Sequence, residues 1–176
     1  MAYKAKAKSI DLHKVQMDAE QAYKDGFFCD EAVLETIINN FEVDIPHEVI
    51  CMVSGMSIGV GRSGCMCGAA NGGVAAIGML FGRDKKLGPK DPEVNKCMAM
   101  THELHDWFKE TNGKGAICCR VLTKEFNMGE GEHKPQCIYF TGLCAYKTAE
   151  ILARELGLPI TNDQLILKKK EELHAA

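Results

Sequence analysis

The hydrophobic and polar positions of this 176-residue chain repeat mostly with the spacing of α-helices. Residues 14–25 place apolar side chains on one face and are followed by Gly26, a residue that commonly ends a helix. Residues 30–40 begin with acidic side chains, and Asp30 is suited to cap that helix. The same pattern predicts further helices over residues 69–82, 94–111 and 137–156 and a shorter one over residues 120–126.

The connecting segments lack such a clear period. The apolar run after Pro46, HEVICMVSGM, suits either a strand or a helix. Residues 83–93 and 127–136 are rich in charge, glycine and proline and are predicted loops. The tail, residues 160–176, is expected to form an amphipathic helix or to pack on a partner. The fold class predicted is mostly α: a single-domain helical bundle over residues 1–176 with a glycine-rich cysteine loop.

Charge and hydropathy exclude several classes of function. The net charge is −3 and the isoelectric point is about 6.1, so nucleic acid is not an expected partner. No stretch reaches the roughly 18 uninterrupted apolar residues that a membrane span requires. The first twelve residues, expected to be an N-terminal extension, carry charges without the apolar run of a secretory signal. The expected location is therefore the cytoplasm.

Cysteine is over-represented in the chain, with nine residues. In a reducing compartment they point to catalysis, metal binding or simple burial rather than to disulfides. The sequence has no C-x-x-C, which excludes covalent haem attachment and removes the usual motifs of dithiol enzymes, zinc pairs and ferredoxins. What remains is a dispersed site, in which thiolates would select iron–sulfur, zinc or copper(I).

The glycine-rich stretch GVGRSGCMCGAANGG occupies residues 59–73. Residues 59–64 match G-x-G-x-x-G, and Asp84 lies where a dinucleotide fingerprint expects a ribose-binding acid. The stretch is not part of a predicted βαβ unit, so a dinucleotide site is not favoured. Instead the glycines are predicted to let the backbone approach a cofactor closely. These cofactor-binding glycines are Gly59, Gly61, Gly64 and Gly68.

Several cysteines stand in contexts that suit a site. Cys65 and Cys67 are two apart in the glycine loop, where both could bind a metal. Cys29 opens a predicted helix, whose dipole lowers the pKa of a thiol and favours a reactive thiolate. Cys51 and Cys97, by contrast, lie on apolar faces and are expected in the core.

His102 and His105 are three apart on a predicted helix, a spacing that could hold a metal. Because Glu103 and Asp106 flank them, they are expected on a solvated face instead.

Four segments together resemble a known family. They are GFFCDEAVLETI, which contains Cys29, the segment CGAANG from Cys67 to Gly72, the pair Cys119-Arg120, and a last cysteine before a helix ending AEIL. Over residues 14–156 the chain resembles the C_GCAxxG_C_C family of redox-active proteins. The resemblance implies a redox domain there with four signature cysteines: Cys29, Cys67, Cys119 and Cys137.

The resemblance extends to the iron–sulfur part of split-Soret cytochromes, which are dimeric helical proteins; their haem motifs are missing here. It implies an iron–sulfur cluster, for instance [2Fe–2S], held by three or four cysteines. The candidates are Cys67, Cys119, Cys137 and either Cys29 or Cys65, with Cys118 as an alternative to Cys119 and Cys144 as an alternative to Cys137.

The expected function is one-electron transfer to a cytoplasmic redox partner protein, within a homodimer. An electron carrier is favoured over an enzyme. Two alternatives stay open: a cysteine- or flavin-dependent oxidoreductase that uses a thiol–disulfide couple, and a zinc-stabilised interaction domain.

Overall fold

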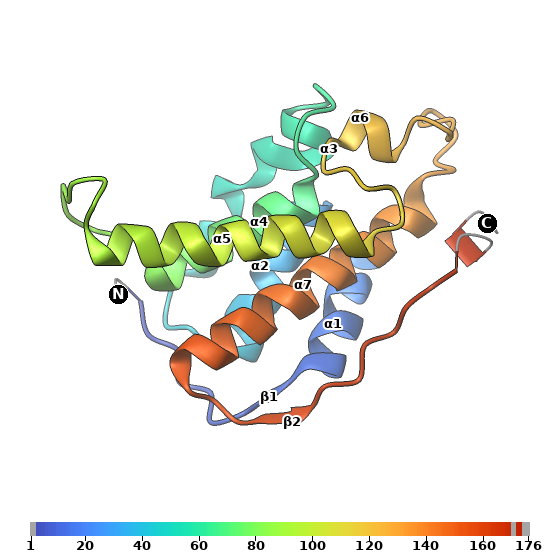
Figure 1. Ribbon diagram of the computed structural model, residues 1–176. Coiled ribbons are helices and arrows are strands. Elements are labelled where there is room, and N and C mark those ends of the chain that lie inside the picture. Colours follow the sequence, from blue (N-terminus) through green and yellow to red (C-terminus); the bar gives the residue numbers. More distant parts are fainter. Residues whose placement is uncertain (1–2, 170–171, 174–176) are drawn as a thin grey trace.

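The computed structural model describes residues 3–169 and 172–173 and is mostly helical, which confirms the predicted fold class (Figure 1). The strands are short and the helices dominate. In chain order the elements are β1 (Ile10–Asp11), α1 (Leu12–Asp25), α2 (Cys29–Asn40), the 3₁₀ helices η1 (His47–Met52) and η2 (Ser54–Met56), α3 (Ser57–Val60), α4 (Gly68–Phe81), α5 (Pro92–Thr111), α6 (Cys119–Leu122), α7 (Lys134–Leu156) and β2 (Ile160–Asn162).

Local signals explain where the long helices begin and end. Helix α1 begins after Asp11, whose carboxylate accepts a hydrogen bond of 2.8 Å from the Lys14 N–H. Helix α5 begins with Pro92, which needs no N–H partner at that position. Helix α7 ends at Gly157, where φ is 65°. Helix α7 begins at Lys134, three residues earlier than the pattern predicts, and α6 is shorter than predicted.

The expected cap of α2 was wrong. The helix begins at Cys29, and Asp30 lies inside it, fully buried, where its carboxylate accepts a 2.6 Å hydrogen bond from the Ser57 hydroxyl. The Glu31 carboxylate satisfies the helix start instead, since it accepts from the Phe28 N–H at 2.8 Å. Asp30 therefore ties α2 to α3 rather than capping its own helix.

Helix α7 is the centre of the fold and packs against α1, α2, α4 and α5 (Figure 1). Its buried side chains include Phe140 and Leu143, and the Phe140 ring meets Phe108 of α5 edge-on at a centroid distance of 5.4 Å. Helices α2 and α4 approach closely because a Cβ on Gly72 would lie 2.9 Å from the Asp30 Cα. Helix α4, which is rich in small residues, is thus closely packed against α2.

The tail differs from the expected helix. Residues 160–162 form β2, which pairs in parallel with β1, and the Ile10 N–H donates to the Pro159 carbonyl at 2.9 Å. Farther along, the Ile166 backbone exchanges two hydrogen bonds with the Gln16 side chain of α1, each 2.9 Å long. Backbone pairing with the N-terminal segment outweighs local helix formation here. Residues 170–171 and 174–176 of that prediction lie outside the described residues.

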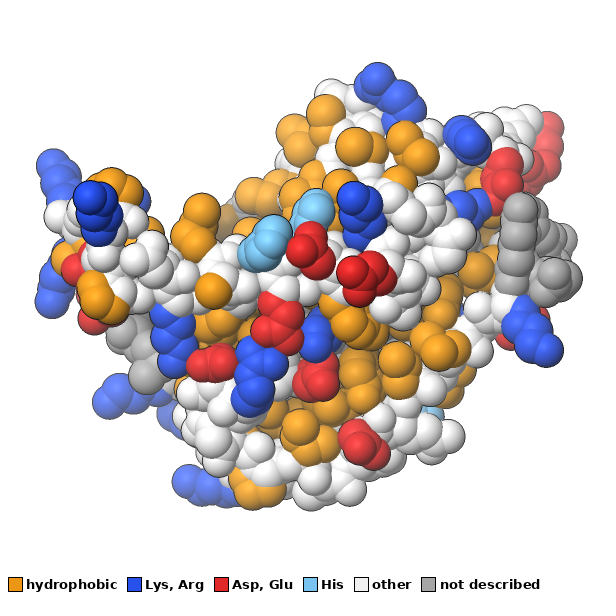
Figure 2. Space-filling model, viewed as in Figure 1, with side chains coloured by type: hydrophobic (Ala, Val, Ile, Leu, Met, Phe, Trp, Pro, Cys, Tyr) orange, Lys and Arg blue, Asp and Glu red, His pale blue; other side chains and the backbone are white. Residues whose placement is uncertain are grey.

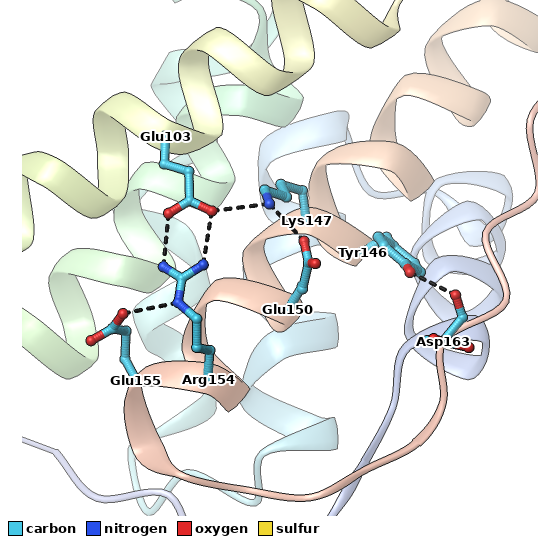
Figure 3. A network of polar contacts seen from close by, with 7 residues as sticks. All are labelled: Glu103, Tyr146, Lys147, Glu150, Arg154, Glu155 and Asp163. Carbon is cyan, nitrogen blue, oxygen red and sulfur yellow. Dashed lines mark hydrogen bonds and ion pairs between the residues drawn. The ribbon is translucent and has the colours of Figure 1, made fainter.

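A polar network joins α5 to α7 on the surface (Figure 3). The Glu103 carboxylate accepts from both terminal nitrogens of Arg154, at 2.9 and 2.7 Å, and lies 3.0 Å from Lys147 Nζ. Basic and acidic side chains are interspersed over this face (Figure 2). No helix within the described residues is both long and apolar enough to cross a bilayer.

Candidate metal centre

Four cysteine side chains line one small cavity of about 40 Å³. They come from four separate helices: Cys29 from α2, Cys67 from the start of α4, Cys119 from α6 and Cys137 from α7. The rest of the lining is mostly apolar or aromatic and consists of Tyr23, Phe28, Ile58, Gly68, Met128, His133 and Phe140. The fold therefore gathers four soft ligands from distant parts of the chain into a largely apolar pocket.

Each of these cysteines lies at or near the N-terminus of its helix. Cys29 and Cys119 are the first residues of α2 and α6, Cys67 caps α4, and Cys137 is in the first turn of α7. Helix N-termini carry free N–H groups and a positive partial charge, which stabilise anions such as thiolates. Helix α6 is a single turn, so its contribution is its N–H groups more than a dipole.

Backbone N–H groups donate directly to two of the sulfurs. The Ile58 N–H hydrogen-bonds to Cys29, and the Ala69 and Ala70 N–H groups hydrogen-bond to Cys67. These bonds favour the thiolate over the thiol. N–H···S bonds of this kind also tune the reduction potential of metal–thiolate centres.

Burial nevertheless outweighs these bonds. It raises the pKa of Cys67 to about 12, and it raises the pKa of Cys29, Cys119 and Cys137 above the ordinary thiol value. Charge repulsion among the neighbouring thiolates adds to the effect at Cys29 and Cys137. The lowered pKa expected for Cys29 from the helix dipole was therefore wrong. Without a neutralising cation these thiols stay protonated at neutral pH.

The loop that precedes Cys67 has an uncommon backbone. Five consecutive residues, 58–62, have positive φ, including the β-branched Ile58 at 54° and Val60 at 63°. Side chains other than glycine rarely adopt this region, so the loop carries strain that its surroundings must maintain. The strained conformation aims the Ile58 N–H at Cys29. Functional sites commonly hold such strain.

Of the four glycines predicted to bind a cofactor, Gly68 lines the cavity. A Cβ on Gly68 would collide with the Cys29 sulfur. A Cβ on Gly59 would lie 2.9 Å from the Cys119 Cβ, and one on Gly64 would lie 2.8 Å from the Arg120 Cβ. A Cβ on Gly61 would lie 4.0 Å from the Gly55 carbonyl oxygen, an ordinary contact, and the φ of Gly61 is 58°. Three of the glycines thus allow close approach of the cysteine-bearing segments, and the fourth supports the loop conformation.

The other cysteines do not line the cavity. Cys65 and Cys118 are exposed beside an isolated bridge between Met66 and Cys118. Cys144 is fully buried in the core, and burial raises its pKa. Cys51 is exposed, contrary to expectation, because the 3₁₀ turn of η1 directs its neighbour Ile50 inward instead.

Cys97 is partly buried against the core. His102 and His105 lie on an exposed face of α5, where both hydrogen-bond or pair with Asp106 at 3.2 and 2.7 Å. Among the described residues, His102, His105 and Asp106 form the group of three potential metal ligands whose donor atoms all lie within 4.8 Å of one another. Asp84 is exposed in a loop, and no βαβ unit occurs in the described part of the chain.

Two side chains that line the cavity were not predicted from the sequence. Tyr23 lines it from α1, and burial together with the neighbouring thiolates raises its pKa. His133 lines it from the residue before α7, and burial lowers its pKa, which favours a neutral ring. For His133, the segment HKPQC contains a sequence pattern that indicates its position. A histidine four residues before Cys137, with a proline at the helix start, places both on one helical face.

Comparisons with known proteins identify a family and a similar fold. A family model described as "Putative redox-active protein (C_GCAxxG_C_C)" matches residues 27–151, a span that contains all four cavity cysteines. One solved structure is similar in fold, the split-Soret cytochrome c from Desulfovibrio desulfuricans ATCC 27774, which has a novel iron centre. The TM-score is 0.65 at 17% identity, over 86% of this chain and 72% of the cytochrome chain. No curated protein matches.

Proposed function

The chain belongs to the C_GCAxxG_C_C family of redox-active proteins, and on that premise we propose that it carries single electrons through an iron–sulfur centre. The ligands of this centre come from Cys29, Cys67, Cys119 and Cys137. The observation that supports this most directly is the convergence of four thiols, from four helix starts, on one small buried cavity.

The donor set and the size of the cavity both fit an iron–sulfur group. Thiolates are the usual protein ligands of such clusters. The cavity is small, about 40 Å³, which suits a compact cluster such as [2Fe–2S].

A structural zinc ion fits less well. Sulfurs bound to one zinc lie ~3.8 Å apart, given a Zn–S bond of about 2.3 Å and tetrahedral geometry. Here any three of the described cysteine sulfurs include a pair separated by more than 4.8 Å. Spacing of this kind suits a core of several atoms between the thiols.

Thiol–disulfide catalysis is also less favoured. An attacking cysteine reacts as its thiolate, and burial raises the pKa of every cavity thiol. In an iron–sulfur centre the iron supplies the positive charge that the buried thiolates lack. The backbone N–H groups at Cys29 and Cys67 then stabilise the added negative charge of the reduced state.

The contact surface for a redox partner is a groove of about 420 Å³ beside the cavity. Groove and cavity share Tyr23 and Phe28, and Phe28 is 42% exposed, which offers a short path from the centre to the surface. The groove is lined by Lys24 and Lys134 and by no carboxylate among the described residues. Its charge suits an acidic electron-transfer protein.

The test is iron binding by matched cysteine variants. Anaerobically purified wild-type protein is expected to be brown, to contain iron and sulfide in equal amounts, and to bleach with dithionite. Cys67→Ser is expected to lose the iron, whereas Cys65→Ser, two residues away and outside the cavity, is expected to keep it. A colourless wild-type protein that binds one zinc would refute the proposal. Equal iron in both variants would refute the site.

A further inference from the structure

His133 stands one helical turn before Cys137. Its backbone is helical, with φ of −72° and ψ of −16°, and its carbonyl accepts a 3.0 Å hydrogen bond from the Cys137 N–H. Residues four apart on a helix present their side chains on the same face, about 5–6 Å apart at Cβ. Paired metal ligands on helices use this spacing.

The imidazole lines the same cavity as the four thiols. Its Nδ1 atom is buried and has no hydrogen-bond partner. Buried polar atoms are nearly always paired, and an exception at a cavity of this kind points to a group that binds there. Two independent observations, position and an unsatisfied nitrogen, thus single out one side chain.

We propose that Nδ1 of His133 is a ligand of the iron centre, alongside cavity thiols. This inference rests on the proposed function. Imidazole is a suitable ligand for iron, and it is neutral where a thiolate is negative. In a largely apolar cavity that already gathers four thiols, a neutral donor reduces the charge that must be buried.

A nitrogen ligand has two consequences. In a cluster that takes four protein ligands, one of the four cavity thiols would then not bind iron. The reduction potential is also higher than that of an all-thiolate cluster, since histidine ligation raises the potential. Replacing His133 frees a coordination position that the spare thiolate can occupy. The expected result is a centre that survives with a lower potential.

Pulsed EPR of the dithionite-reduced wild-type protein, grown with ¹⁴N- or ¹⁵N-histidine, tests the assignment. The expected spectrum contains a directly coordinated nitrogen whose coupling changes with the isotope. In His133→Ala this coupling disappears, iron content is retained and the midpoint potential falls. The matched control is His105→Ala, on the exposed face of α5, which should leave the coupling and the potential unchanged.

Iron-loaded wild-type protein without an isotope-sensitive coupling would overturn the ligand assignment and leave the proposed function standing. So would a coupling that persists in His133→Ala. Wild-type protein that binds no iron would refute the proposed function and the ligand with it. If the alanine variant fails to fold, the labelled wild-type spectra still decide whether histidine binds iron, and His133→Gln then identifies which one.

Discussion

Replacement of Gly68 by alanine should damage the thiol site while leaving helix α4 itself intact. Gly68 is the first residue of α4, and a Cβ there would lie closer to the Cys29 sulfur than the 3.0 Å limit of real structures. The next contacts, the Ser57 Cα at 3.6 Å and the Asp30 Cγ at 3.7 Å, leave the new methyl group little room to move away. The sulfur must therefore yield.

The size of the effect follows from these distances. Ordinary non-bonded contacts begin at about 3.5 Å, so the Cys29 sulfur must shift by roughly 1 Å. Overpacking of this kind costs about 1–3 kcal/mol, from which the entropic gain of glycine to alanine in a helix subtracts about 0.5–1 kcal/mol. The net loss of unfolding free energy is about 0–2.5 kcal/mol. A shift of this size also disturbs metal–sulfur bonds, so iron content should fall.

Gly78 provides the matched control on the same helix. No heavy atom lies within 4 Å of the Cβ that Gly78→Ala would add, so this variant should gain about 0.5–1 kcal/mol from helix propensity. Chemical denaturation of the metal-free proteins measures both free energies, and iron analysis after anaerobic reconstitution measures occupancy. If Gly68→Ala matched Gly78→Ala in stability and iron content, the close approach at Cys29 would be irrelevant to the site.

Two further predictions concern the surface. The hydrogen bonds from Arg154 and the nearby Lys147 hold the pKa of Glu103 at about 2, well below its ordinary value of 4.5. The carboxylate therefore stabilises the fold above about pH 4.5, and this contribution, on the order of 1 kcal/mol after solvent screening, is lost as the pH falls towards 2. Thermal melts should show a smaller loss of stability over that range in Glu103→Gln than in wild type; identical pH profiles would contradict the assignment. The double variant Lys24→Glu/Lys134→Glu should slow electron transfer to an acidic ferredoxin at low salt in stopped-flow measurements, with iron content unchanged. A rate insensitive to both salt and charge reversal would exclude the groove as the docking surface.

Much of the fold could be predicted from local pattern. Termination acts within a few residues, so the helices predicted to end at residues 25 and 156 end there in the structure. The predicted helix cap at Asp30 was wrong, because its carboxylate accepts a hydrogen bond from the Ser57 hydroxyl, which lies 27 residues away in the sequence. The tail was missed for the same reason, since its partner strand is at the opposite end of the chain.

The site was only partly predictable. The order of the cysteines in the chain and their flanking residues indicated the site. Choosing between Cys137 and Cys144, however, requires knowing where each side chain on α7 lies relative to the cavity. Cys137 lies at the cavity and Cys144 lies in the core. The pKa of Cys29 depends on burial, which opposes the local helix dipole and outweighs it. Local electrostatics were visible in the sequence, and desolvation was not.

The pairing of β1 with β2 has a consequence for the order of folding. All four cavity cysteines are synthesised before residues 160–162, and those residues close onto residues 10–11. Closing a loop of nearly the whole chain is slow compared with helix formation, and it cannot occur while the C-terminal segment is still in the ribosome. The nascent helices can therefore assemble their thiols first. Metal loading can then precede the pairing of β1 with β2, which joins the N-terminal segment to the segment that follows α7.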